Sequence, residues 1–187
     1  METIRAFVAI PLNAAIISRL EKVYRELKSL PVDVKWVRPE SIHLTLKFLG
    51  DVAIERTEVI GQALQRALLG FKPWVVEIRK IGIFPAMRNP RVVWVGMDDA
   101  TGQIITLQER VEGELAAVGF EKEQRKFSPH LTLGRVRSPR GKTELVNYLI
   151  DEREKEFGEL QVWRVVLFKS ELKPTGAVYT ELREFLL

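Results

Sequence analysis

Cysteine is absent from this chain of 187 residues, and histidine occurs only twice. Without cysteine there can be no disulfide bond, no cysteine nucleophile and no thiolate metal site. Long apolar runs are also missing, because the apolar stretch near the N-terminus, residues 6–12, is short and contains Pro11. An acidic residue, Glu2, precedes that stretch where a signal peptide carries positive charge. We therefore expect a cytoplasmic protein that has no membrane-spanning segment.

Neither sign of charge dominates the composition. Lys and Arg together number 29 against 25 for Asp and Glu, which gives a formal net charge of +4 at pH 7. This mild basic excess is compatible with a polyanionic partner but does not require one. Hydrophobic residues make up 46% of the chain, which is enough for an ordinary core. The length corresponds to one domain, and we expect a monomeric single domain over residues 1–187.

The order of apolar patterns repeats along the chain. Each half is predicted to run strand, helix, strand, helix, strand. Arg5 precedes the first histidine by 38 residues, and Arg91 precedes the second by 39. Interleaved strands and helices favour an α/β or α+β fold, and the pattern alone leaves parallel and antiparallel sheets open. The predicted strands cover residues 5–11, 42–49, 74–84, 91–96, 127–136, 160–172 and 177–180, and the predicted helices cover 13–30, 59–70, 104–119 and 142–153.

The boundary between the halves is predicted in the segment from Pro85 to Pro90, where two prolines flank a short polar stretch. This places approximate lobes at residues 1–87 and 88–187.

Both histidines lie in the same six-residue pattern, Ser-x-His-Leu-Thr-Leu, at residues 41–46 and 128–133. The alternation predicts a strand, whose successive side chains point to opposite faces. The two leucines of each copy then face the core, and the serine, histidine and threonine share the other face. The polar set is Ser41, His43 and Thr45 in the first copy and Ser128, His130 and Thr132 in the second.

Two histidines and two threonines on opposed strands suit displacement at phosphorus. Histidine has an unperturbed pKa of about 6.5, so one copy can act as a base and the other as an acid near neutrality. One takes a proton from the attacking water, and the other gives a proton to the departing sugar oxygen. Thr45 and Thr132 would hydrogen-bond the non-bridging phosphate oxygens. This scheme needs no metal ion.

Two other interpretations of the motif stay open. Each histidine can be a structural residue of its strand that was duplicated with the rest of the pattern. A zinc site is the other alternative, but zinc usually takes three or four protein ligands, and no matched carboxylate cluster accompanies the two histidines. We expect catalytic histidines, no bound metal and no cofactor.

Strand parity makes a prediction for two basic residues. Lys47 shares the parity of the first histidine, so it is expected either to reach a phosphate or to lie at an exposed edge. Arg135 has the parity of the face opposite the second histidine, unless a β-bulge intervenes.

Other binding candidates are close to the motifs in sequence. Arg38 and Arg125 could contact phosphate groups. Phe48 or Phe127 could stack on a base, although a core position is the more common role for an aromatic residue. The candidate substrate-binding residues are Lys47, Arg125, Arg135, Ser41, Ser128 and Phe48.

The doubled His-Leu-Thr-Leu motif resembles the paired HXTX signatures of the 2H phosphoesterase superfamily. The flanking blocks resemble more closely the RNA 2′,3′-cyclic phosphodiesterases, a family long labelled 2′-5′ RNA ligases. The resemblance runs from the first strand to the last, and the matching stretches are Arg5–Ile10, Trp36–Asp51, Gly82–Pro85, Pro90–Trp94 and Gly119–Arg135.

This resemblance implies an α+β fold of duplicated β-α-β-α-β units, with two pseudo-symmetric lobes whose antiparallel sheets line a central cleft and whose helices lie outside. It implies a hydrolase that opens RNA 2′,3′-cyclic phosphate ends, including those of tRNA fragments, to 2′-phosphates. His43 would be the proton donor and His130 the proton acceptor. The alternatives are a 2′-5′ RNA ligase that acts on tRNA halves and a non-catalytic module that binds RNA or a nucleotide.

Overall fold

The computed structural model describes residues 2–174 and 176–187. In chain order the elements are β1 (Thr3–Pro11), α1 (Ala14–Ser29), β2 (Val34–Trp36), the 3₁₀ turn η1 (Pro39–Ser41), β3 (His43–Ala53), η2 (Ile54–Arg56), α2 (Thr57–Leu68), β4 (Trp74–Ala86), β5 (Asn89–Asp98), α3 (Gln103–Ala117), β6 (His130–Val136), α4 (Lys142–Asp151), β7 (Glu156–Val162), β8 (Arg164–Lys173) and β9 (Gly176–Leu186).

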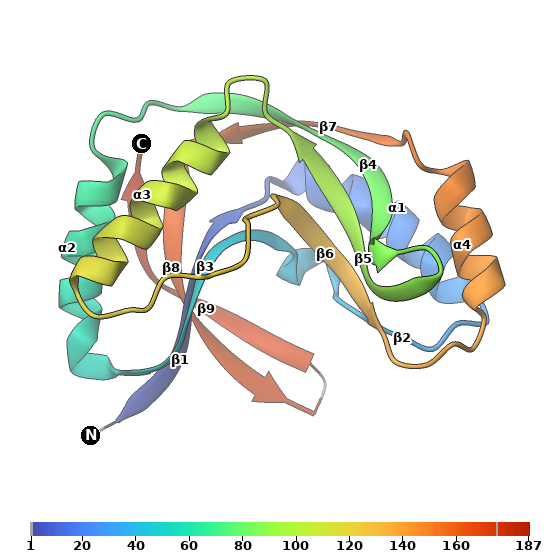
Figure 1. Ribbon diagram of the computed structural model, residues 1–187, viewed down its shortest axis with the longest axis horizontal. Coiled ribbons are helices and arrows are strands. Elements are labelled where there is room, and N and C mark those ends of the chain that lie inside the picture. Colours follow the sequence, from blue (N-terminus) through green and yellow to red (C-terminus); the bar gives the residue numbers. More distant parts are fainter. Residues whose placement is uncertain (1, 175) are drawn as a thin grey trace.

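The strands form two antiparallel sheets. Sheet A has the order β3-β1-β8-β9, and sheet B has the order β2-β6-β5-β4-β7. In Figure 1, α2 and α3 lie on one side of the molecule and α1 and α4 on the other, with the strands between them. An α+β fold with antiparallel sheets and outer helices is thereby confirmed.

Each sheet combines strands from both halves of the chain. β4 closes the first half but pairs with β5, and β8 lies in the second half but pairs with β1. The segment from Pro85 to Pro90, predicted as a boundary, is the tip of the β4–β5 hairpin. The division into residues 1–87 and 88–187 therefore separates the sequence repeats but does not separate the two sheets.

The helices cover one face of each sheet. α1 begins as predicted after Asn13, whose side-chain oxygen accepts the backbone N–H of Ile16 at 2.9 Å. α3 contacts β3 and α2 contacts β9 in sheet A, whereas α1 contacts β7 and α4 contacts β4 in sheet B. Apolar side chains from all four helices and from both sheets form one continuous core. We call the side of each sheet opposite these helices its site face.

Two predicted strands differ from the structure, and one observed strand was not predicted. The short strand β2 lies where the sequence predicts a loop, and β6 begins only at His130. The predicted strand over residues 160–172 is two strands, because β7 belongs to sheet B and β8 to sheet A, with the exposed Trp163 between them. Among the described residues, no helix is both long enough and apolar enough to span a bilayer.

Candidate active site

The two histidines occupy matching places at the starts of β3 and β6. In each, the ring Nδ1 lies within hydrogen-bonding distance of the backbone carbonyl two residues earlier: 2.9 Å from the Ser41 oxygen for His43 and 2.7 Å from the Ser128 oxygen for His130. A carbonyl oxygen only accepts, so Nδ1 must carry the hydrogen in both rings. The other nitrogen, Nε2, is then free to exchange a proton. The two serines thus contribute to the site through their carbonyl oxygens.

Matching β-bulges follow the two threonines. The β1–β3 register shifts between Thr45 and Lys47, and the β5–β6 register shifts between Thr132 and Gly134. Each bulge adds one residue, so the side chains beyond it change faces. The burial patterns of β3 and β6 agree over seven residues, the whole length of β6, with two consecutive buried positions at each bulge. The repeat seen in the sequence therefore extends to the local backbone geometry.

The bulge removes Lys47 from the site face, so the prediction that it contacts a phosphate is corrected. Its Nζ lies 2.6 Å from Glu112 Oε2 of α3 and 2.6 Å from the Glu121 carbonyl oxygen. Only 6% of Lys47 is exposed, so it is not an edge lysine either. The prediction was wrong because it assumed that side chains alternate strictly between the two faces, whereas the bulge adds an extra residue, Leu46, to the strand.

The same bulges bring Phe48 and Arg135 to the site faces. Phe48 pairs in register with Phe7, and its ring centroid lies 6.1 Å from that of Phe7. It is 68% exposed, so it is available for stacking and is not a core residue. Arg135 lies beyond the second bulge and is exposed. Arg135 was predicted to lie on the face opposite His130 unless a β-bulge intervened. The bulge is present, so Arg135 shares the face of His130.

An aromatic cluster surrounds His43. Its ring stacks on Phe7 with centroids 4.7 Å apart and planes 26° apart, and Tyr179 of β9 meets it edge-on at 5.1 Å. Phe168 of β8 stacks on Phe7 at 5.2 Å. Burial in these surroundings disfavours the charged imidazolium and lowers the pKa of His43 to about 4, against the smaller opposing effect of the Ser41 carbonyl.

His130 has different surroundings. Phe84 of β4 meets its ring edge-on, with centroids 5.2 Å apart, and Phe84 stacks in turn on Trp94 at 5.1 Å. Trp94 lies directly over Gly82, where an added Cβ would come within 2.4 Å of the indole. The glycine therefore makes room for the aromatic pair that flanks the second histidine.

Several contacts bring the two histidine-bearing strands together. β3 contacts β6, and the chain just before β3 is attached to β6 by the hydrogen bond from Val37 N–H to the Leu133 carbonyl at 2.8 Å. Tyr179, which touches His43, is close enough to Arg135 and Arg5 for their positive charges to lower its pKa, although burial raises it more. The site faces of the two sheets therefore adjoin, with Tyr179 between their polar groups.

Tyr179 and Phe7 were not among the site residues predicted from sequence. β9 meets the histidine only through long-range strand pairing, so no local pattern marks Tyr179. The alternation of β1 puts Phe7 on the same face as Arg5, and this was the available signal.

The remaining predicted residues have distinct places. Neither threonine hydroxyl forms a hydrogen bond with any other residue that the structure describes, so both are available to a ligand. The guanidinium of Arg125 is paired with Glu123, with Nη2 3.0 Å from Oε2. Arg38 is exposed beside Glu40 at 3.4 Å, and Phe127 packs against the core.

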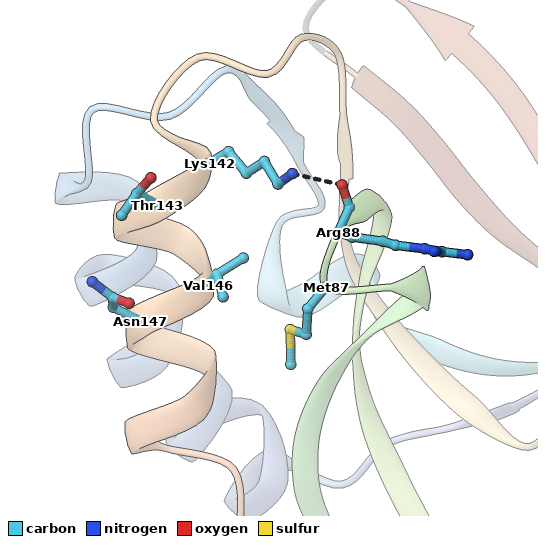
Figure 2. A pocket seen from close by; sticks show the side chains of 6 residues that line it. All are labelled: Met87, Arg88, Lys142, Thr143, Val146 and Asn147. Atoms are coloured by element: carbon cyan, nitrogen blue, oxygen red, sulfur yellow. Dashed lines mark hydrogen bonds between the residues drawn. The ribbon is translucent and has the colours of Figure 1, made fainter.

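A separate cavity of about 300 Å³ lies between the β4–β5 hairpin and α4 (Figure 2). Lys142 extends across it and donates to the Arg88 carbonyl, while the Arg88 side chain points away. None of its lining residues belongs to either histidine motif. Within residues 2–174 and 176–187, no group of three or more His, Asp or Glu side chains is arranged to hold a metal ion.

In each repeat, a strand presents a threonine beside a histidine whose Nε2 is free to exchange a proton. This is the arrangement expected of a two-histidine phosphoesterase. Residues 10–94 and 95–179 each match the model of the LigT-like phosphoesterase family. The chain belongs to this family, as the doubled motif predicted.

Relatives with this architecture cover nearly the whole chain. The RNA 2′,3′-cyclic phosphodiesterase of Methanothermobacter thermautotrophicus is 36% identical over 184 residues, with 98% of this chain and 99% of the relative covered. The protein of the same name from Aquifex aeolicus is 32% identical, with 100% and 99% covered. The crystal structure of TT0787 of Thermus thermophilus aligns with a TM-score of 0.79 at 28% identity over 98% of this chain and 97% of that one. E. coli LigT complexed with 3′-AMP aligns with a TM-score of 0.78 at 26% identity over 100% and 99%.

Proposed function

We propose that this protein hydrolyses the 2′,3′-cyclic phosphate ends of RNA to 2′-phosphate ends. The observation that carries the proposal is the matched pair of histidines, each with Nδ1 fixed by a carbonyl and Nε2 free. Relatives that span the chain and carry the name RNA 2′,3′-cyclic phosphodiesterase support the choice of substrate.

The reaction needs one proton acceptor and one proton donor. His130 Nε2 takes a proton from a water molecule, whose oxygen attacks phosphorus. The bond from phosphorus to the 3′ oxygen breaks, and His43 Nε2 gives its proton to that oxygen, which leaves a 2′-phosphate and a 3′-hydroxyl. One water is consumed, and the two histidines exchange protonation states. Thr45, Thr132 and Arg135 stabilise the negative charge on the non-bridging oxygens.

This division of roles is the one that the family resemblance implies, and it requires His43 to be protonated when the substrate is bound. His43 has a pKa of about 4 in the free protein, so it is neutral at pH 7. A bound phosphate anion next to Nε2 stabilises the imidazolium and raises its pKa. His43 therefore acquires its proton together with the substrate and then gives it to the departing oxygen. His130 lies in a more open position, where water can reach it.

Exposed aromatic and basic groups at the site suit the end of an RNA chain. Phe48 offers a stacking surface for the terminal base, and Arg135 offers a bidentate contact to phosphate. All of these groups come from one chain, so we propose that the protein acts as a monomer. Fragments of tRNA that end in cyclic phosphates, in the cytoplasm, are the proposed natural substrates.

The test is an incubation with a short RNA ending in a 2′,3′-cyclic phosphate, with and without EDTA, analysed by mass spectrometry. The proposal predicts a gain of one water and a 2′-phosphate product at the same rate in both samples. Binding without any water gain, across cyclic phosphates of all four bases and 2′-5′-linked RNA, would instead indicate a binding module.

A further inference from the structure

One buried polar cluster has no part in the proton transfers. Among the described residues, the buried polar or charged side chains are Lys47, Gln108 and Glu112, at 6%, 7% and 7% exposure. All three lie in one hydrogen-bonded group between β3 and α3. A charged pair is costly to bury and seldom stabilises a fold more than apolar packing would. Its place in the fold therefore calls for a role other than stability.

Each of the three side chains forms a hydrogen bond with a particular piece of backbone. Lys47 Nζ donates to Glu112 Oε2 and to the Glu121 carbonyl, each at 2.6 Å. The same Glu112 oxygen accepts the backbone N–H of Glu123 at 3.3 Å. Gln108 Nε2 donates to the other Glu112 oxygen at 3.3 Å and to the carbonyl of Leu46, the bulged residue of β3, at 3.5 Å. The cluster thus joins the first histidine strand to the segment that follows α3.

That segment, residues 121–129, leads into the second histidine strand. This segment lies outside the helices and strands. In the part of the chain that the structure describes, no backbone N–H or carbonyl of the segment forms a hydrogen bond with another backbone group. The hydrogen bonds that attach it to preceding elements are those from Lys47 to Glu121 and from Glu123 to Glu112. Its last residues include Ser128, whose carbonyl fixes the Nδ1–H of His130.

The duplication gives an internal comparison. Gly134 follows the second bulge where Lys47 follows the first, and an added Cβ there would come within 2.6 Å of Trp36. The second repeat therefore has no room for such a side chain. The tether exists in one repeat only and reaches across to the other.

We infer that the Lys47–Glu112 ion pair is a positioning device that sets the orientation of His130 relative to the β3 strand of His43. It holds the 121–129 segment, and this segment holds the Ser128 carbonyl against the imidazole. The inference rests on the proposed function for its rate measurement only, because the orientation of His130 can be observed without any substrate.

The test replaces both partners, since removing one would leave a buried charge without its partner and could unfold the protein. Lys47→Met with Glu112→Leu removes both tethers, whereas Lys47→Met with Glu112→Gln keeps an acceptor for the Glu123 N–H. Tyr148→Phe is the matched control, because it removes a 2.6 Å hydrogen bond to Glu26 that joins α4 to α1, outside the site. All variants are compared at a temperature at which each is folded.

We expect the Leu double variant to lose tenfold or more in kcat with a smaller change in KM, because misplacement of a catalytic group by about 1 Å can cost about a hundredfold. Amide exchange should accelerate over residues 121–129, and the ring nitrogen spectrum of His130 should show a mixture of tautomers. The Gln double variant should lie between this variant and wild type, and Tyr148→Phe should match wild type in all three measurements.

Wild-type kcat, amide exchange and His130 tautomer in a folded double variant would overturn the inference. If the Leu variant does not fold, amide hydrogen exchange near Glu121 in the Gln variant tests the inference, because that variant also lacks the hydrogen bond from Lys47 to Glu121. If the wild-type protein hydrolyses no cyclic phosphate, the proposed function fails, while exchange and tautomer still decide on the tether.

Discussion

His43 lies stacked on Phe7, with ring centroids 4.7 Å apart, at the junction of β1 and β3. Its counterpart His130 has an aromatic neighbour only at its edge, Phe84, at 5.2 Å, among the residues that the structure describes. The two repeats therefore carry the same hydrogen-bond geometry around Nδ1 but different surroundings around the ring. This asymmetry gives different environments to the histidines of two motifs that are identical in sequence from histidine to the second leucine.

The lowered pKa of His43 can be observed directly. We expect its ring to titrate near 4 in the free protein, because burial disfavours the imidazolium. Addition of a nucleoside 2′-monophosphate, a product analogue, should raise that pKa. NMR titration of the His43 ring, assigned by comparison with His43→Gln, provides the measurement. A pKa at or above 6.5 in the free protein would contradict the aromatic burial.

The same pKa affects stability. Between about pH 4 and pH 6.5 the unfolded chain binds a proton at His43 and the folded protein does not, so the free energy of unfolding should fall as the pH is lowered through this window. The contribution is up to about 3 kcal/mol, fully present above pH 6.5. Denaturant unfolding of wild type and His43→Gln across this range isolates it, since the carboxylates are common to both. If the free energies of unfolding of the two proteins changed in parallel with pH, the contribution of His43 would be ruled out.

Phe48 should contribute to substrate binding without contributing to stability. It is 68% exposed, and base stacking on an aromatic is worth about 1–3 kcal/mol. Phe48→Ala should therefore raise KM for cyclic-phosphate RNA by about fivefold or more, with kcat less affected. Leu69→Ala, at a site 67% exposed at the end of α2, is the matched control. Equal KM values in the two variants would show that Phe48 does not contribute to substrate binding.

Arg135 and Arg125 should differ in effect, although both lie close to the second motif in sequence. Arg135 lies on the face of His130, whereas the Arg125 guanidinium is already paired with Glu123. Arg135→Gln should lower kcat/KM by about 10²-fold, the usual loss when one charge-stabilising donor is removed. Arg125→Gln should lower it by less than about threefold, within the small range typical of an exposed ion pair. Equal losses, measured at one ionic strength, would contradict the placement of Arg135.

Much of the site follows from strand alternation. The shared face of His43 and Thr45, the buried leucines behind them, and the cap at Asn13 depend on residues a few positions apart. The antiparallel pairing depends on contacts far apart in the sequence, and here only the family resemblance supplied the answer. The exchange of β4 and β8 between the sheets depends on such contacts too, and it was not predicted.

The wrong prediction for Lys47, two residues after Thr45, has a simple physical cause. A β-bulge shifts parity by one residue, and no residue type at Leu46 or Leu133 marks it. Lys47 was therefore assigned to the wrong face. Tyr179 was missed because its nearness to the histidine arises from pairing of the C-terminal strands with β1. The sequence did show that Lys47 and Gly134 stand at equivalent positions, and a phosphate contact would be expected in both repeats.

We propose that His43 and His130 together transfer the protons of cyclic phosphate hydrolysis. The most direct measurement is the single-turnover rate of opening of an RNA 2′,3′-cyclic phosphate by His43→Ala and His130→Ala, each verified as folded. We predict that each loses about 10²–10⁴-fold relative to wild type, and that the double variant loses little more than the more impaired single variant. Full activity in either single variant would contradict the two-histidine mechanism.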